Sequence, residues 1–202
     1  VYSYDKVTSS QTDWRGKYLI VYETDSLAMD GSLETLDAVS NTKSVTISDN
    51  KIATDVDGLI GGNAIYFTVD YKGTSTSIYS LMSASGKYIS GTTTSAKAGN
   101  GIKQADNPDD YEITFSGTEL QSKSSDQQMA MKYNKASDQK RFRFYKSGQE
   151  AVALYKWTDH MTPGEDIPSD ERHAIRIGNV SCSKSPLIAG DTLDISDFSI
   201  QV

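Results

Sequence analysis

Short runs in which apolar and polar residues alternate follow one another along the first 157 residues of the chain. The clearest run is 141–146 (RFRFYK), where Phe142 and Phe144 are predicted to face a core and the arginines beside them to face solvent. The run 151–157 (AVALYKW) is apolar on both faces and should lie more deeply. Together the two runs predict a hairpin that closes an all-β domain.

Similar runs recur upstream, separated by turn residues such as Gly, Asn, Asp and Ser. They predict strands over 17–23, 27–32, 44–48, 51–54, 64–70, 77–84, 87–92, 101–105, 111–116, 119–123 and 129–134. The inward positions on these strands predict a core that contains Ile20, Phe67, Phe115, Phe142 and Phe144. Residues 32–39 alone show a spacing of three, which allows one short helical turn.

The strand runs group in fours, with a rough internal repeat. Three four-stranded units predict a single closed barrel of the β-trefoil type, and closure would explain how many short strands avoid exposed edges. However, Gly16-Lys17-Tyr18 and Gly86-Lys87-Tyr88 look like equivalents in the repeat. The first falls in the first strand of its unit and the second in the second strand of its unit, which a regular repeat would not allow. Another β-barrel or a sandwich is therefore the alternative.

The composition changes after Trp157. Residues 158–172 (TDHMTPGEDIPSDER) hold two of the four prolines and several acidic residues, which predicts a linker. Residues 173–202 contain strand-like pieces but are too few for a complete Ig-like sandwich. We expect a module over 1–157, a linker over 158–172, and a C-terminal extension or truncated Ig-like segment over 173–202.

The net charge of −7 and the pI near 4.8 argue against a nucleic-acid surface, which needs a basic stripe. One local basic patch is interpreted as a solvated strand face; its members are Lys132, Lys135, Lys140, Arg141 and Arg143. The single cysteine, Cys182, excludes both an intramolecular disulfide and a cysteine zinc site. No apolar run approaches the length of a membrane span.

Catalytic and metal-binding patterns are scarce. The two histidines, His160 and His173, lie in or beside the predicted linker, where neither a Ser/His/Asp triad nor a metal site would be held rigidly. The segment 55–58 (DVDG) resembles the opening of a calcium loop, but the LIGG that follows supplies no further ligand. We therefore expect no catalytic residues, no metal and no cofactor.

The remaining candidate chemistry is aromatic. The two tryptophans, Trp14 and Trp157, lie near the two ends of the module, and the chain has twelve tyrosines. Sugars stack their apolar faces on exposed aromatic rings, so Trp14 and Trp157 are the candidate ligand-binding residues. The alternative interpretation is that both are core residues where the first and last strands meet.

Several motifs occur in a characteristic order over residues 2–157: DWRGKYLIVYE, SLMSASGKYISG and RFRFYKSGQEAVALYKW. In this order they resemble a β-rich accessory module of exported and surface multidomain proteins of Bacteroidetes gut bacteria. The resemblance implies an extracellular or cell-surface location, a leader that has been removed, and neighbouring Ig-like or hydrolase domains. It carries over no catalytic signature.

These observations predict a non-catalytic extracellular module for carbohydrate binding or surface adhesion, with a glycan and neighbouring domains as its partners. The alternative is a structural spacer or targeting domain attached to a secreted hydrolase such as a nuclease or glycosidase.

Overall fold

The computed structural model describes residues 2–91, 99–108, 111–124, 127–159, 179–182 and 198–201. Contacts divide the chain into two compact units, residues 1–161 and 162–202. The described residues are all-β, with one short 3-10 turn, η1 (Glu23–Asp25). Within them, no helix has the length and apolar character needed to cross a membrane.

The strands of the first unit are short, and most end at turns. They are β1 (Tyr2–Lys6), β2 (Gly16–Tyr22), β3 (Leu27–Met29), β4 (Thr42–Ser44), β5 (Lys51–Thr54), β6 (Phe67–Tyr71), β7 (Tyr79–Ser83), β8 (Tyr88–Gly91), β9 (Ile102–Ala105), β10 (Ile113–Ser116), β11 (Glu119–Ser124), β12 (Gln127–Asn134), β13 (Arg141–Tyr145) and β14 (Ala153–Asp159).

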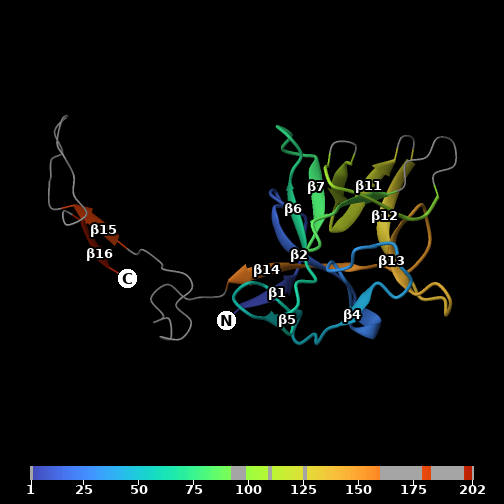
Figure 1. Ribbon diagram of the computed structural model, residues 1–202, viewed down its shortest axis with the longest axis horizontal. Helices are drawn as coiled ribbons and strands as arrows, with labels where there is room; N and C mark the ends of the chain where they lie inside the picture. Colours follow the sequence, from blue (N-terminus) through green and yellow to red (C-terminus); the bar gives the residue numbers. More distant parts are fainter. Residues whose placement is uncertain are drawn as a thin grey trace. The chain divides into compact units, whose positions relative to one another are not determined.

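These fourteen strands form one sheet in the order β13-β12-β11-β10-β7-β6-β2-β14-β1-β5, with β3 and β4 branching from β2, and β8 and β9 from β7. The path ends at β13 on one side and at β5 on the other, so the sheet is not closed into a barrel. The predicted closed barrel and its trefoil grouping are therefore not confirmed. The grouping left out β1, which pairs with β14 on one side and with β5 on the other (Figure 1).

Two hydrophobic clusters lie on opposite faces of β2. Tyr18, Ile20 and Tyr22 face the larger cluster, whereas Leu19 and Val21 face the smaller one. Because both faces are covered, successive residues of β2 are apolar instead of alternating. The neighbouring β14 is arranged in the same way, with Leu154 in one cluster and Tyr155 in the other. The prediction that 151–157 lies more deeply than 141–146 is wrong, because only Leu154 and Tyr155 of this run are buried, whereas four of the five residues of β13 are. The predicted hairpin between the two runs is also wrong, since β13 pairs with β12 and β14 pairs with β1 and β2.

The larger cluster contains most of the predicted core. Ile20, Phe67, Phe142 and Phe144 have no exposed side-chain surface, which confirms the strand register. Phe115 is only half-buried and packs against this cluster.

The prediction that the arginines of β13 face solvent is wrong for Arg141. Arg141 is only 8% exposed, and its Nη1 donates to the carbonyl oxygen of Asp37 at 3.1 Å. Arg143, from the same strand, pairs with the Asp37 carboxylate. The loop that carries Asp37 covers this face of β13, and alternation within the strand could not show that.

The second unit is described only at β15 (Asn179–Cys182) and β16 (Phe198–Gln201), which pair antiparallel. The predicted linker lies outside the described residues, except that β14 extends into it as far as Asp159.

Replacing Phe142 with alanine tests the core. The change should cost about 3–5 kcal/mol of unfolding free energy, because it leaves a cavity among fully buried rings. Val39→Ala is the control, since Val39 is 49% exposed and should change stability by less than about 0.5 kcal/mol. Chemical denaturation followed by circular dichroism measures both, and equal small effects would contradict the core assignment.

Candidate functional site

The two candidate tryptophans have different surroundings. Trp14 is 4% exposed and stacks on Phe115, with ring centroids 4.0 Å apart and planes 5° apart. A ring packed in this way has no face available for a sugar. Trp14 therefore acts as a core residue, and the ligand-binding prediction depends on Trp157 alone.

Trp157 lies near the end of β14 and is half-buried. The antiparallel register places Tyr4 of β1 directly opposite it and Tyr2 at the diagonal position on the same face. The Tyr2 ring stacks against Trp157, with centroids 5.9 Å apart and planes only 3° apart. Pairing of β1 with β14 thus builds a parallel aromatic pair at the end of the sheet.

A lysine and a further tyrosine complete this group. The Lys17 ammonium lies 4.5 Å from the Tyr66 ring centroid and 5.6 Å from that of Trp157, within the range of cation–π attraction. Lys17 also donates a hydrogen bond to the carbonyl oxygen of Asp57 at 2.7 Å. We call Tyr2, Lys17, Tyr66 and Trp157 the aromatic cluster.

The tight loop at 55–59 packs against Trp157. Gly58 has φ +81°, and a Cβ at this position would lie 2.8 Å from the Tyr4 hydroxyl and 3.2 Å from Cδ1 of Trp157. The Tyr4 hydroxyl donates to the Gly58 carbonyl oxygen at 2.7 Å. Burial, with the nearby Tyr66 and Asp55, raises the pKa of Tyr4 above its usual value, so this hydroxyl remains a donor.

The same loop contains the DVDG segment that resembles a calcium loop. Oδ1 of Asp55 accepts hydrogen bonds from the backbone N–H groups of Asp57 (3.1 Å) and Leu59 (2.8 Å). These bonds identify a turn stabilised by an aspartate side chain. Across the described ranges, no group of three or more His, Cys, Asp or Glu side chains is placed to hold a metal ion.

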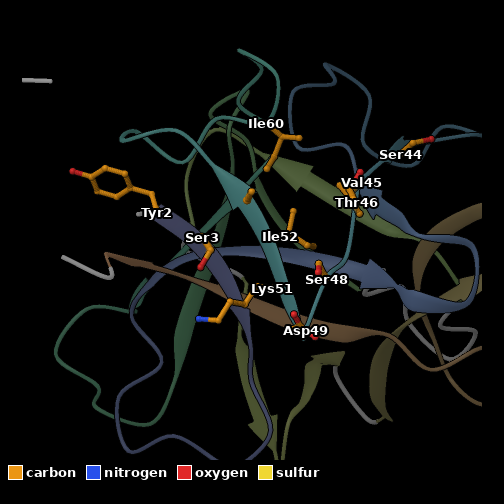
Figure 2. A pocket seen from close by; sticks show the side chains of 11 residues that line it. Tyr2, Ser3, Ser44, Val45, Thr46, Ser48, Asp49, Lys51, Ile52 and Ile60 are labelled. Carbon is orange, nitrogen blue, oxygen red and sulfur yellow. The ribbon is translucent and has the colours of Figure 1, made fainter. Parts of the chain in front are cut away.

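An open cavity of about 880 Å³ begins beside the aromatic cluster and follows β5. Tyr2 belongs to both features, and Figure 2 shows it at one end of the cavity with its ring directed away from Ile60 and Val45, which lie along the other sides. We call this cavity the β5 groove. Its lining is mostly apolar and consists of Tyr2, Ser3, Ser44, Val45, Thr46, Ser48, Asp49, Lys51, Ile52, Ala53 and Ile60.

The chain enters β5 through a two-residue turn. Asp49 and Asn50 have φ of 50° and 61°, as a type I′ hairpin requires, and Ser48 and Lys51 exchange two backbone hydrogen bonds of 2.8 and 2.9 Å. The hairpin closes one end of the outer edge of β5. At the other end, the Asp55 N–H donates to the Leu59 carbonyl oxygen at 3.3 Å.

Between these two ends, one residue of the edge remains open. Lys6 N–H donates to the Asn50 carbonyl oxygen, so Lys6 and Asn50 form a hydrogen-bonded pair of the antiparallel β1–β5 ladder. Hydrogen-bonded pairs then recur at every second residue. The backbone N–H and C=O groups of Ile52 and Thr54 therefore point toward β1, whereas those of Ala53 point outward, away from β1. The outward N–H and C=O of Ala53 have no hydrogen-bond partner among the described residues.

The charges around the groove are few. Lys51 pairs with Asp5 at 2.9 Å, and the Asp49 side chain is exposed at the turn. The rim is therefore weakly acidic, which suits a neutral ligand better than an anionic one.

A second, smaller cavity of about 250 Å³ contains an ion pair between Lys6 and Glu23 at 2.8 Å. Tyr155 also donates to Glu23, at 2.5 Å. Burial raises the pKa of Glu23, but the two hydrogen bonds outweigh it and leave the pKa below its usual value. Because both charges are satisfied within the protein, this cavity offers little to a ligand.

The basic patch predicted around β12 and β13 is largely neutralised. Lys132 pairs with Glu119 at 2.6 Å, Lys135 pairs with Glu150 at 2.7 Å, and Arg143 pairs with Asp37. The two histidines lie outside the described residues.

Comparison of the chain with protein-family models, with curated proteins and with solved structures finds no match. The structure alone therefore carries the assignment of the site.

Sequence reasoning located Trp157 but missed Tyr2 and the groove residues Ala53 and Ile60. The strand-like start of the chain and the Asp49-Asn50 turn were visible signals. What they could not show is that β1 inserts between β14 and β5 and so brings these residues together.

Gly58→Ala tests the support beneath Trp157. Alanine at φ +81° is strained, and its Cβ would displace Tyr4 or Trp157, so we expect a loss of at least about 2 kcal/mol and a shift of tryptophan emission. Gly61→Ala is the matched control, because Gly61 also has a positive φ (+55°) but nothing lies within 4 Å of its added Cβ. Equal losses and unchanged emission in both variants would contradict the contact.

Proposed function

We propose that this chain is a non-catalytic, extracellular or cell-surface module that binds carbohydrate through the aromatic cluster. The observation that carries the proposal is the parallel Tyr2–Trp157 pair at the rim of the β5 groove. A half-buried pair of parallel rings beside a cavity can present a ring face on which the apolar face of a sugar stacks.

Polar groups for sugar hydroxyls are available close to this surface. Thr46, Ser48 and Asp49 line the groove and have exposed side chains. A single shallow site of this kind supports binding near the millimolar range, about −4 kcal/mol. Such affinity suits a module that adds weak contacts to those of neighbouring domains.

The extracellular setting is supported by the sequence resemblance to accessory modules of exported proteins. The proposal gives the chain no catalytic role, since the sequence places both histidines in or beside the linker.

The second candidate is a structural spacer or targeting domain of a secreted hydrolase. The burial of Trp14 favours it, because one of the two tryptophans expected to bind a ligand is a core residue. A spacer would leave the Tyr2–Trp157 pair with a packing role only.

Sugar titration separates the two candidates. We expect tryptophan emission to change on addition of neutral oligosaccharides from mucin and plant polysaccharides, with Kd near 1 mM. Tyr2→Ala and Trp157→Ala should each weaken binding about tenfold or more, because each removes one ring of the parallel pair and leaves the other without its stacking partner. Isothermal titration calorimetry serves as the readout for Trp157→Ala, which lacks the reporter ring.

Tyr71→Ala is the control. Tyr71 is also half-buried and paired with another ring, Tyr79, but lies on β6, away from the residues that line the groove. It should leave the affinity unchanged. A flat titration across a broad glycan panel would favour the spacer.

A further inference from the structure

The β5 groove offers one outward backbone N–H and one outward C=O, both from Ala53. In an extended residue these two groups point in the same direction, and they favour a ligand that presents an acceptor and a donor side by side. The edge is closed at Lys51 by Ser48 and at Asp55 by Leu59. One open residue is too short to pair with an added strand of several residues, so a compact ligand fits better than an extended peptide.

The surroundings of Ala53 add a second requirement. Val45 and Ile60 form apolar sides of the groove, and Tyr2, which belongs to the aromatic cluster, lies at its other end. Ile60 is half-buried, so part of its side chain is accessible from the groove. The site thus combines a paired donor and acceptor, a small apolar wall and a stacking surface.

The charges at the rim favour a neutral ligand over an acidic one. Lys51 is paired with Asp5, and Asp49 adds a negative charge at the rim. An acidic sugar would be repelled, while a neutral one would not.

We propose that the β5 groove recognises the 2-acetamido group of a neutral N-acetylhexosamine, an inference that rests on the proposed carbohydrate binding. The amide N–H of the sugar donates to the Ala53 C=O, and the adjacent 3-hydroxyl oxygen accepts from the Ala53 N–H. The acetyl methyl group contacts Ile60 and Val45, while the sugar ring extends toward Tyr2.

The acetyl methyl group is the reason that an N-acetylhexosamine is favoured over a hexose without an acetamido group. A vicinal diol could make the same two hydrogen bonds, but it has no methyl group to bury against the apolar wall. Burying one methyl group corresponds to about fourfold in affinity. We therefore expect N-acetylglucosamine to bind about fourfold more tightly than glucose, and N,N′-diacetylchitobiose to bind about fourfold more tightly than cellobiose.

The test uses the full chain labelled with ¹⁵N, and titrates it with these four sugars while amide chemical shifts are recorded. The Ala53 amide should move with the N-acetylated sugars at a Kd that matches the tryptophan signal. An N-acetylated, amidated pentapeptide is titrated as the alternative ligand.

Two variants probe the contacts. Ile60→Ala should reduce the preference for the N-acetylated sugars to near onefold, while binding of glucose is unchanged. Ile47→Ala is the matched control, since Ile47 is also half-buried and packs on the same cluster but does not line the groove. Ala53→Pro removes the outward N–H without removing a ladder bond to β1, and should weaken all N-acetylated sugars about tenfold.

The outcomes are distinguishable. Equal affinity for both sugar classes, or binding without movement of the Ala53 amide, would overturn this inference and leave the proposed function standing. Absence of binding to all sugars would overturn both. Binding of the peptide alone would overturn both and assign the groove to a peptide. Because Ile60→Ala and the shift of Ala53 do not depend on the proline variant, misfolding of that variant would not affect the result.

Discussion

The pairing of β1 with two strands is the constraint on which the rest of the first unit depends. The first strand of the chain inserts between β14, the last strand of this unit, and β5. It pairs the start of the chain with the last strand of the unit, Tyr2 opposite Asp159, and covers the outer edge of β14. It also fixes the register that places Tyr2 and Tyr4 beside Trp157. A slip of one residue would turn both tyrosines to the opposite face and abolish the aromatic cluster.

The same pairing explains why the sheet has a free edge at all. With β1 inside the sheet, β5 becomes the last strand, and its outer backbone groups need protection from uncontrolled pairing. The chain protects them at both ends, by the Ser48–Lys51 hairpin and by the turn that Asp55 stabilises. The residue left open between them, Ala53, lies in a groove, so the protection of the edge and the candidate site are parts of one arrangement.

Burial on both faces has a further consequence for function. Because β2 and β14 are covered on each side, the centre of the sheet is rigid and has little surface for a ligand. The strand ends and edges, where Trp157, Tyr2 and Ala53 lie, are therefore the places that the proposed binding uses. A ligand bound there would meet groups already held in place by the sheet, which would reduce the entropic cost of a weak interaction.

Local patterns along the chain were enough to establish the class of the fold, the approximate positions of the strands and the register of the most regular ones. Alternation with a period of two is a local property, so Phe142, Phe144 and Phe67 could be assigned to the core directly. Turn residues are a second local signal: Asp49 and Asn50 separate two of the predicted strands, and the conformation of this turn depends on the residues within it. The burial of Trp14, the covering of Arg141 and the open path of the sheet were decided only by the tertiary structure. Each of these depends on which distant segment lies opposite a strand, and local periodicity carries no information about that partner.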